Sequence, residues 1–219
     1  MSEIVHYLGI DDELVGVSSF CDDPFCRGKE RVGGIVNPGI EKVISLKPTL
    51  VICTTMTPER ICESFKRFGI RTERFRLVSL KDVFRVMDVL ARELGAPPAS
   101  GRFKEELKRE LAGLRPCLKG KRVFIALSVK PLYCAGSSTY LGQLLELAGA
   151  KVVPRGDFRA VSPELLFSLR PDLILSFGGC GGPGKVNCLD VSRLKSDLLR
   201  PGPRVLSGLE KLRRKVCFR

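Results

Sequence analysis

The sequence predicts an α/β protein of two lobes, each with a parallel sheet, joined by helices. The main observation is a repeat, because EKVISLKPTLVI at residues 41–52 returns as ELLFSLRPDLIL at residues 164–175. The copies lie too far apart for a solenoid, whose periods are roughly 20–50 residues. In each copy an apolar helical face precedes a proline and a short apolar run, which is typical of a helix leading into a buried strand.

Each copy of the repeat has a glutamate at its start and a proline near its middle. Pro48 and Pro171 end the two helices, and we expect them to hold the preceding residue in extended geometry. Glu41 and Glu164 open the helices, where the helix dipole favours a carboxylate. The two lobes are therefore expected to share one helix–strand corner, with an acidic residue at its start.

The first lobe is expected to span residues 1–78. It should contain a helix over 2–8, a strand over 14–19, a loop over 20–37, the first copy of the repeat, and a helix over 57–68 that ends at Gly69. Residues 79–120 are expected to link the lobes through two helices. The first is amphipathic from Leu80 to Leu94, and the second, over 100–114, is charged on most of its circumference.

The second lobe is expected to span residues 121–219. We predict a strand over 123–127, a loop over 131–138, a helix over 140–147, a strand over 151–153, the second copy of the repeat, a glycine-rich loop over 178–184 and a last helix over 205–212. Aligned on the repeat, the first lobe has no counterpart of the strand that opens the second. We therefore expect its first strand to be missing, with Met1 near the loop where that strand would end, through a misassigned start codon or a truncation.

The composition narrows the class of protein. The chain has 219 residues, 44% of them hydrophobic, yet no apolar run approaches the length of a transmembrane helix, and no signal peptide is visible. The net charge of +13 is interpreted as a solvated basic surface, because no nucleic-acid-binding motif accompanies it. The nine cysteines show no Cys-x-x-Cys spacing, which favours a reducing compartment or a thermophile over a disulfide-stapled secreted domain.

Several segments together resemble a known family. These are GIDDELVGVSSFCDDP at residues 9–24, VGGIVNPGIEKVISLKP at 32–48, PLYCAG at 131–136, VSPE at 161–164 and RPGPR at 200–204. They resemble the class III periplasmic substrate-binding proteins of ABC importers, within the helical-backbone metal receptor superfamily. The branch that they resemble most comprises the cobalamin-binding and iron–siderophore receptors.

The resemblance implies two Rossmann-like lobes joined by a long backbone helix, with the ligand held in the cleft between the lobes. It implies a monomeric binding protein, not an enzyme, that requires no cofactor and delivers a corrinoid or an Fe(III) chelate to an ABC permease. Glu41 and Glu164 would be the docking points for the permease. The family implies a periplasmic or cell-surface location, although the lack of a visible signal peptide also fits a cytoplasmic protein. Two alternatives stay open: a cytoplasmic carrier or sensor of a metal cofactor, and a non-binding interaction module with the same fold.

The candidate ligand residues come from the loops that follow the predicted strands, because ligands of open α/β sheets bind beyond the carboxyl ends of the strands. A flat apolar ligand needs aromatic area, which these loops supply together with two cysteines. The candidates are Phe20, Phe25, Tyr133, Tyr140, Cys53 and Cys180.

The loop cysteines have two further interpretations. Cysteine is most often buried and inert, but thiolates near a ligand site also bind soft metals. The candidates for such a metal site are Cys21, Cys26, Cys53, Cys134 and Cys180. The single histidine, His6, does not form a multi-histidine site, and neither a phosphate-binding loop nor a catalytic constellation is recognisable.

Overall fold

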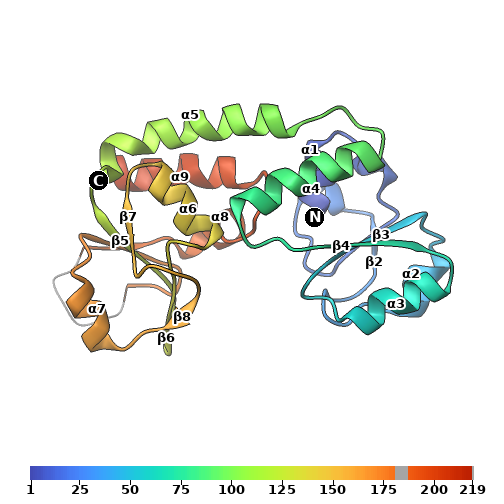
Figure 1. Cartoon of the computed structure of the whole chain (residues 1–219), viewed down its shortest axis with the longest axis horizontal. Helices are drawn as coiled ribbons and strands as arrows, with labels where there is room; N and C mark the ends of the chain where they lie inside the picture. Colours follow the sequence, from blue (N-terminus) through green and yellow to red (C-terminus); the bar gives the residue numbers. More distant parts are fainter. Residues whose placement is uncertain (181–186, 219) are drawn as a thin grey trace. The chain divides into compact units, whose positions relative to one another are not determined.

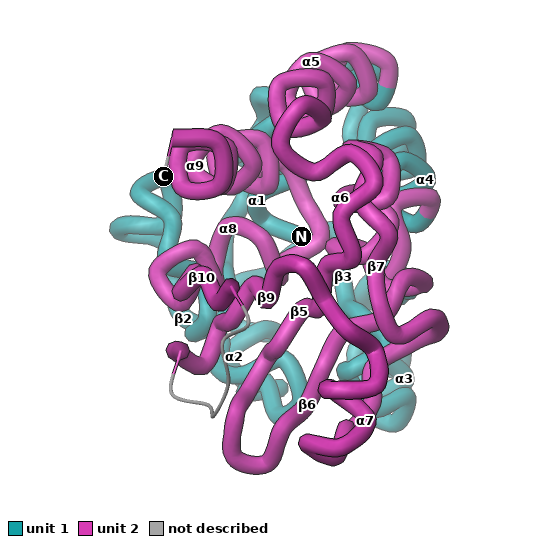
Figure 2. The backbone as a smooth tube through the Cα atoms, turned by 90° about the vertical axis from the view of Figure 1, so that its left-hand side faces the viewer, with its two compact units in different colours: residues 1–77, 82–100 teal, residues 78–81, 101–219 magenta. Residues whose placement is uncertain are grey.

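The computed structural model describes residues 1–180 and 187–218 and divides the chain into two compact units (Figures 1 and 2). Unit 1 consists of residues 1–77 and 82–100, and unit 2 of residues 78–81 and 101–219. Residues 79–120, expected to link the lobes, are thus divided between them: most of α4 (Leu80–Glu93) belongs to unit 1, and most of α5 (Ser100–Leu118) to unit 2. No helix within the described ranges is long and apolar enough to cross a membrane.

Unit 1 contains two separate pairs of parallel strands. Strand β1 pairs with β2, and β3 pairs with β4 with Leu50 opposite Arg71. Strands β2 and β4 were not expected, because both are short and largely polar. The elements in chain order are α1 (Ser2–Tyr7), β1 (Gly16–Val17), β2 (Glu30–Arg31), α2 (Ile40–Ser45), β3 (Leu50–Thr54), α3 (Glu59–Arg67) and β4 (Arg71–Phe75).

Unit 2 contains one mixed sheet. Its strands follow the order β10-β9-β5-β6-β8, with β7 also paired to β5. Antiparallel β6 lies where a loop was expected. The elements are β5 (Arg122–Val129), β6 (Leu132–Ala135), α6 (Tyr140–Leu147), β7 (Lys151–Val153), β8 (Arg159–Ala160), α7 (Pro163–Leu169), β9 (Leu173–Ser176), β10 (Cys188–Asp190), α8 (Lys195–Leu198) and α9 (Val205–Cys217).

Strand β5 is the centre of the sheet of unit 2. Val123 lies opposite Val152 of β7 on one edge and opposite Leu173 of β9 on the other, and both pairings are parallel. The side chains of Val123, Phe124 and Ile125 are fully buried. A strand buried on both faces needs this continuous apolar sequence, which explains why β5 was predicted without difficulty.

Unit 1 has part of the same order of helices and strands as unit 2, but without a strand that corresponds to β5. In chain order α1, β1, α2 and β3 correspond to α6, β7, α7 and β9, and the repeat places α2 and β3 opposite α7 and β9. Strand β5 precedes this series in unit 2. Among the described residues of unit 1, no strand takes the place that β5 has in unit 2.

The shared corner differs from the prediction at one residue in each copy. Lys47 and Arg170, which precede the two prolines, have positive φ angles of 49° and 42° instead of extended geometry. Each amide bonds back three residues, to the carbonyls of Ile44 and Phe167, at 2.9 and 3.1 Å. A proline disfavours the right-handed helical conformation of the residue before it. The left-handed conformation of Lys47 and Arg170 avoids this conflict and also ends the helix.

Three disulfide bonds join six of the nine cysteines: Cys21–Cys26, Cys117–Cys217 and Cys180–Cys188. Disulfides persist in oxidising surroundings, so these bonds argue against the expected reducing compartment, whereas they are compatible with the other expectation, a thermophile. The second bond joins α5 to α9 across 100 residues of sequence. No local spacing reveals such a pair.

We expect the long-range disulfide to stabilise the protein more than a short-range one. In the loop-closure account, replacing Cys117 and Cys217 with serine costs about 5 kcal/mol of unfolding free energy, whereas replacing Cys21 and Cys26 costs about 2 kcal/mol. Urea unfolding of the two double variants, without reductant, measures the difference. Equal midpoints for both variants would contradict the expectation.

Candidate functional site

The loop that follows β1 is held by an arginine from the neighbouring strand. Arg31 of β2 donates hydrogen bonds from Nη1 to the carbonyls of Ser18 and Cys21, at 3.1 and 2.6 Å. The Cys21–Cys26 disulfide closes the next turn of the same segment. Hydrogen bonds from a charged donor are stronger than neutral ones, so they help to hold this loop in one conformation, together with a 3₁₀ turn at Pro24–Cys26.

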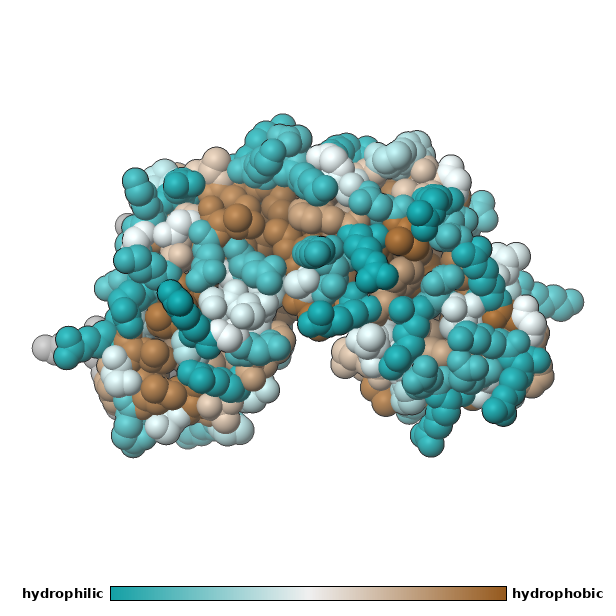
Figure 3. All heavy atoms as spheres, in the orientation of Figure 1, coloured by the Kyte–Doolittle hydropathy of each residue, from teal (hydrophilic) through white to brown (hydrophobic). Residues whose placement is uncertain are grey.

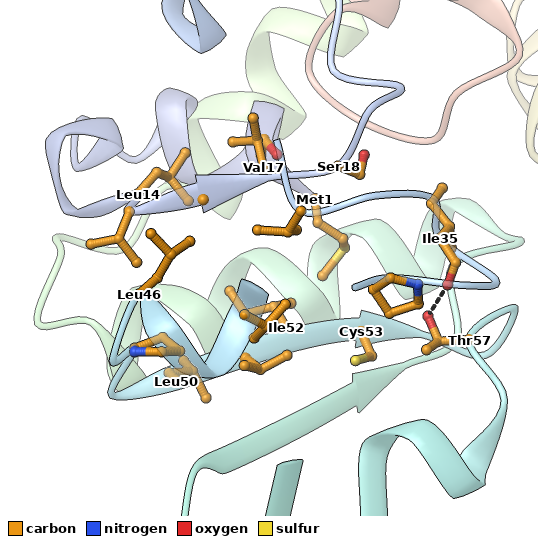
Figure 4. Close-up of a pocket in the computed structure, with 18 of the residues that line it drawn as sticks. Met1, Leu14, Val17, Ser18, Ile35, Leu46, Leu50, Ile52, Cys53 and Thr57 are labelled. Carbon is orange, nitrogen blue, oxygen red and sulfur yellow. Dashed lines mark hydrogen bonds between the residues drawn. The ribbon is translucent and has the colours of Figure 1, made fainter. Parts of the chain in front are cut away.

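The loop that follows β3 is held in the same way. Arg74 of β4 donates from Nε to the carbonyl of Thr57 at 3.3 Å, and from Nη2 to the carbonyl of Thr55 at 3.0 Å. The Thr57 hydroxyl donates to the carbonyl of Ile35 at 2.9 Å, which joins this loop to the segment after β2 (Figure 4). Three loops at the carboxyl ends of strands are thereby fixed within unit 1.

These loops present three exposed apolar side chains. Phe20, Val36 and Met56 are 60, 53 and 66% exposed and follow β1, β2 and β3 respectively. A Cβ atom built on Gly34 would lie 3.8 Å from the Phe20 ring, which places Phe20 beside the segment that bonds to Thr57. The sequence analysis found Phe20 but missed the other two. Their signal is an isolated large apolar residue among turn-forming residues, in VGGIVNPG and TTMTP.

The other three aromatic candidates have different surroundings. Phe25 is half-buried and stacks on His6, with ring centroids 4.3 Å apart. Tyr140 is buried in unit 2, where its hydroxyl donates to the carbonyl of Gly202 at 3.4 Å, and that its ring contacts a ligand stays a prediction. Tyr133 of β6 is 39% exposed and stays a candidate. That these rings line one cavity stays a prediction, because the structure defines each unit by itself.

The thiolate-metal interpretation does not hold for the five loop cysteines. Cys21, Cys26 and Cys180 form disulfides, with Cys180 bonded to Cys188, and so supply no thiolate. The described residues include no group of three histidine, cysteine or acidic side chains placed to hold a metal ion. The glycine-rich loop predicted over 178–184 lies outside the described residues from 181 onward.

Cys53 and Cys134 carry free thiols, but neither is poised as a ligand. Cys53 lies in β3 and is 6% exposed. Its burial, together with the neighbouring Cys62, raises its pKa to about 12. Burial also raises the pKa of Cys134 above its ordinary value. Both groups are therefore protonated thiols at neutral pH, in keeping with the structural role usual for buried cysteine.

Unit 1 also contains an apolar cavity of about 260 Å³. Leu14 and Val17 line one side, Leu50 and Ile52 of β3 line another, and Met1 lies between them (Figure 4). A Cβ atom at position 16 would lie 2.8 Å from a methyl group of Leu46 and 2.9 Å from one of Val32, so a larger residue there requires these two side chains, which also border the cavity, to shift. Native interiors hold few voids larger than a water molecule, so a cavity of this size needs an explanation.

The two glutamates of the repeat are exposed at helix starts, as predicted. Glu41 lies in the first turn of α2 and Glu164 in the first turn of α7. Ser162 caps α7 by accepting a hydrogen bond from the amide of Leu165 at 3.2 Å. The Ser162 hydroxyl, followed by the glutamate's own amide, lowers the pKa of Glu164 below its ordinary value, so this carboxylate is charged at neutral pH. That the two glutamates share one face stays a prediction.

Helix α7 presents apolar area beside its carboxylate. Leu165 and Phe167 are 37 and 52% exposed, and none of the residues of α7 is buried. On the face drawn in Figure 3, hydrophilic residues are widespread, and apolar residues appear in patches among them. An exposed helix with large apolar side chains and a capped charge is a reasonable contact surface for a protein partner.

Comparison with known proteins shows which family the chain resembles. Residues 1–185 match the family model described as periplasmic binding protein. The chain is 26% identical to the ABC transporter substrate-binding lipoprotein YvrC of Bacillus subtilis (strain 168), over 96% of this chain and 75% of that protein. It is 22% identical to the vitamin B12-binding protein of Photorhabdus laumondii, over 96% and 82%. A possible iron-binding protein of Staphylococcus epidermidis has a similar fold, with a TM-score of 0.79 at 23% identity, over 98% of this chain and 94% of that one.

The division of the cysteines into three disulfides and three free thiols predicts how many thiols react with a thiol reagent. With a pKa of about 12, only about one Cys53 in 10⁴ is ionised at pH 8, so the folded protein should react very slowly with a thiol reagent. Unfolding without reductant should expose the three free thiols, and reduction should release all nine. Titration with Ellman's reagent under the three conditions measures these numbers. Nine thiols before reduction would contradict the disulfides.

Proposed function

Because the chain belongs to the periplasmic binding protein family, we propose that it is the substrate-binding protein of an ABC importer that delivers a corrinoid or an iron chelate to a permease. The names of similar proteins support both ligand classes, since one binds vitamin B12 and another is described as possibly iron-binding. We further propose that the protein works outside the cytoplasm. Its three disulfides and its similarity to a lipoprotein favour this location.

The observation that carries the ligand proposal is the set of braced loops in unit 1. Phe20, Val36 and Met56 expose apolar area on loops that hydrogen bonds from Arg31, Thr57 and Arg74 respectively hold in place. A large flat ligand is bound at low entropic cost when the surface that receives it is already ordered. We therefore propose that these three side chains contact the apolar face of the ligand.

A cytoplasmic metal-cofactor carrier is the less favoured alternative. It requires reduced thiols near the ligand, whereas three of the five candidate cysteines are in disulfides and Cys53 is held as a protonated thiol. A non-binding interaction module is the second alternative. The exposed apolar residues of α7 are compatible with it, and a ligand titration separates the two functions.

We expect the purified protein to bind cobalamin, cobinamide, haem or a ferric siderophore in a titration followed by ligand absorbance. Phe20→Ala should weaken binding by roughly 1–3 kcal/mol, the value for removing a large apolar side chain from a contact. Phe68→Ala is the matched control, because Phe68 is 64% exposed but follows α3 and lies outside the braced loops. Equal losses in both variants would refute the loop site, and no binding to any ligand would favour the interaction module.

The permease contact is tested separately. Since Glu41 and Glu164 are exposed carboxylates, Glu41→Ala and Glu164→Ala together should lower transport roughly 10-fold through slower association, with ligand affinity unchanged. The matched control is Glu59→Ala, an exposed glutamate in the first turn of α3 that is not part of the repeat. Transport is measured in vesicles that carry the permease and its ATPase. Unchanged transport in the double variant would refute the docking assignment.

A further inference from the structure

Two of the three free cysteines lie together in the core of unit 1. Cys53 is in β3 and Cys62 is in α3, and they are 6 and 2% exposed. Helix α3 also buries Ile61 and Phe65, which belong to one apolar cluster with Val51 of β3. This packing places Cys62 against the strand, and the side chains of Cys53 and Cys62 are hydrogen-bonded to each other.

The surroundings of this pair leave room for its sulfur atoms to move. Cys53 borders the apolar cavity of about 260 Å³, and Cys62 borders a separate pocket of about 200 Å³. A disulfide bond requires the two sulfurs to approach to about 2 Å, with the two Cβ atoms roughly 3.5–4.5 Å apart. Two thiols that are already in contact, each beside open space, reach this geometry through small side-chain rotations.

The pocket at Cys62 gives small solutes a route to the pair. It lies between the end of β3, α3 and β4, and its lining includes the exposed residues Thr55, Lys66 and Arg74. A pocket of this size admits part of a small molecule, whereas a folded protein cannot enter it. Cys62 borders this pocket and Cys53 does not, so Cys62 is the thiol that a small reagent meets first.

The other cysteines of the chain indicate that the protein meets oxidants. Three disulfides are formed, and disulfides persist in oxidising surroundings. The remaining thiols of the same chain are exposed to the same conditions. Two thiols in contact are oxidised by exchange with a disulfide reagent, through a mixed disulfide that the second thiol resolves.

We propose that Cys53 and Cys62 form a dithiol site that a small-molecule disulfide, such as glutathione disulfide, oxidises to a fourth disulfide bond. The Cys62 thiolate attacks one sulfur of the reagent, which forms a mixed disulfide and releases one glutathione. Cys53 then attacks Sγ of Cys62, and the second glutathione leaves and takes up the proton of Cys53. The two protein thiols lose two electrons, and the reagent is reduced to two glutathione thiols.

The new bond would close a short ring around one of the braced loops. The ring spans residues 53–62 and contains Met56, one of the three exposed apolar residues on those loops. It joins the carboxyl end of β3 to α3 and so restricts the connection between them. In the loop-closure account, a ring of this length should raise Tm by about 5–10 °C.

The test uses the full chain with its three disulfides intact. The protein is incubated with glutathione disulfide over hours, the time scale of slow disulfide exchange, because the pair is buried. The thiols released on unfolding should fall from three to one, the mass should fall by two hydrogen atoms, and Tm should rise. Peptide mapping without reductant should show Cys53 joined to Cys62.

Single variants test the order of the two steps. Cys53→Ala should accumulate a mixed disulfide between Cys62 and glutathione, because no second thiol resolves it, and Cys62→Ala should keep both of its free thiols. The matched control is Cys134→Ala, because Cys134 is a buried free thiol in the apolar cluster of Phe124 in unit 2. This control should form the new disulfide at the rate of the unchanged protein.

Three outcomes would overturn the proposal. The first is that all three thiols remain after oxidation, and the second is that the unchanged protein keeps bound glutathione without closing the ring. The third is that peptide mapping joins Cys134, instead of Cys53, to Cys62. Because these readouts involve neither a transported ligand nor a permease, their failure is distinct from a failure of the proposed transport function.

Discussion

Backbone pairing along both edges of β5 is the interaction on which unit 2 depends. This strand pairs with β7 on one side and with β9 on the other, and its side chains Val123, Phe124 and Ile125 are fully buried. Unit 1 has the flanking elements of the same plan but divides its strands into two separate pairs. Its order therefore relies more on side-chain contacts, among them the arginine bonds to loop carbonyls and the cluster of Val43, Ile61 and Phe65.

Much of this fold was predictable from the sequence where a repeat or a run of apolar residues was clear. The repeated corner predicted α2, β3, α7 and β9, and the internal comparison predicted the missing strand of unit 1. Strand β4 was missed because RTERF carries four polar residues and does not resemble a buried run. Strand β6 was missed because Pro131 and Gly136 flank it and suggest a loop, whereas the two residues mark the ends of a hairpin arm. The geometry at Lys47 and Arg170 was wrong because the rule for residues before proline excludes right-handed helix but still permits the left-handed region.

The candidate site was predictable only in part, because it depends on contacts between segments that are distant in the sequence. The position of Phe20 followed from its loop after a strand, but its accessibility and that of Val36 and Met56 depend on hydrogen bonds between distant segments. The surroundings of Tyr140 were not predictable either, because its burial and its hydrogen bond to the carbonyl of Gly202 depend on packing against a distant segment. Cysteine pairing is equally non-local. Cys117 and Cys217 become neighbours only after α5 and α9 have packed.

The bond between those two cysteines has a topological consequence. All six strands of the unit 2 sheet, from β5 to β10, lie between Cys117 and Cys217 in the chain. The sheet is therefore built within a covalent ring, whereas unit 1 is a linear segment outside it. A protease that cuts the backbone once between these cysteines would open the ring but release no fragment. The two pieces would migrate together on a gel until a reductant separated them, whereas a single cut in α3 would detach its amino-terminal piece at once.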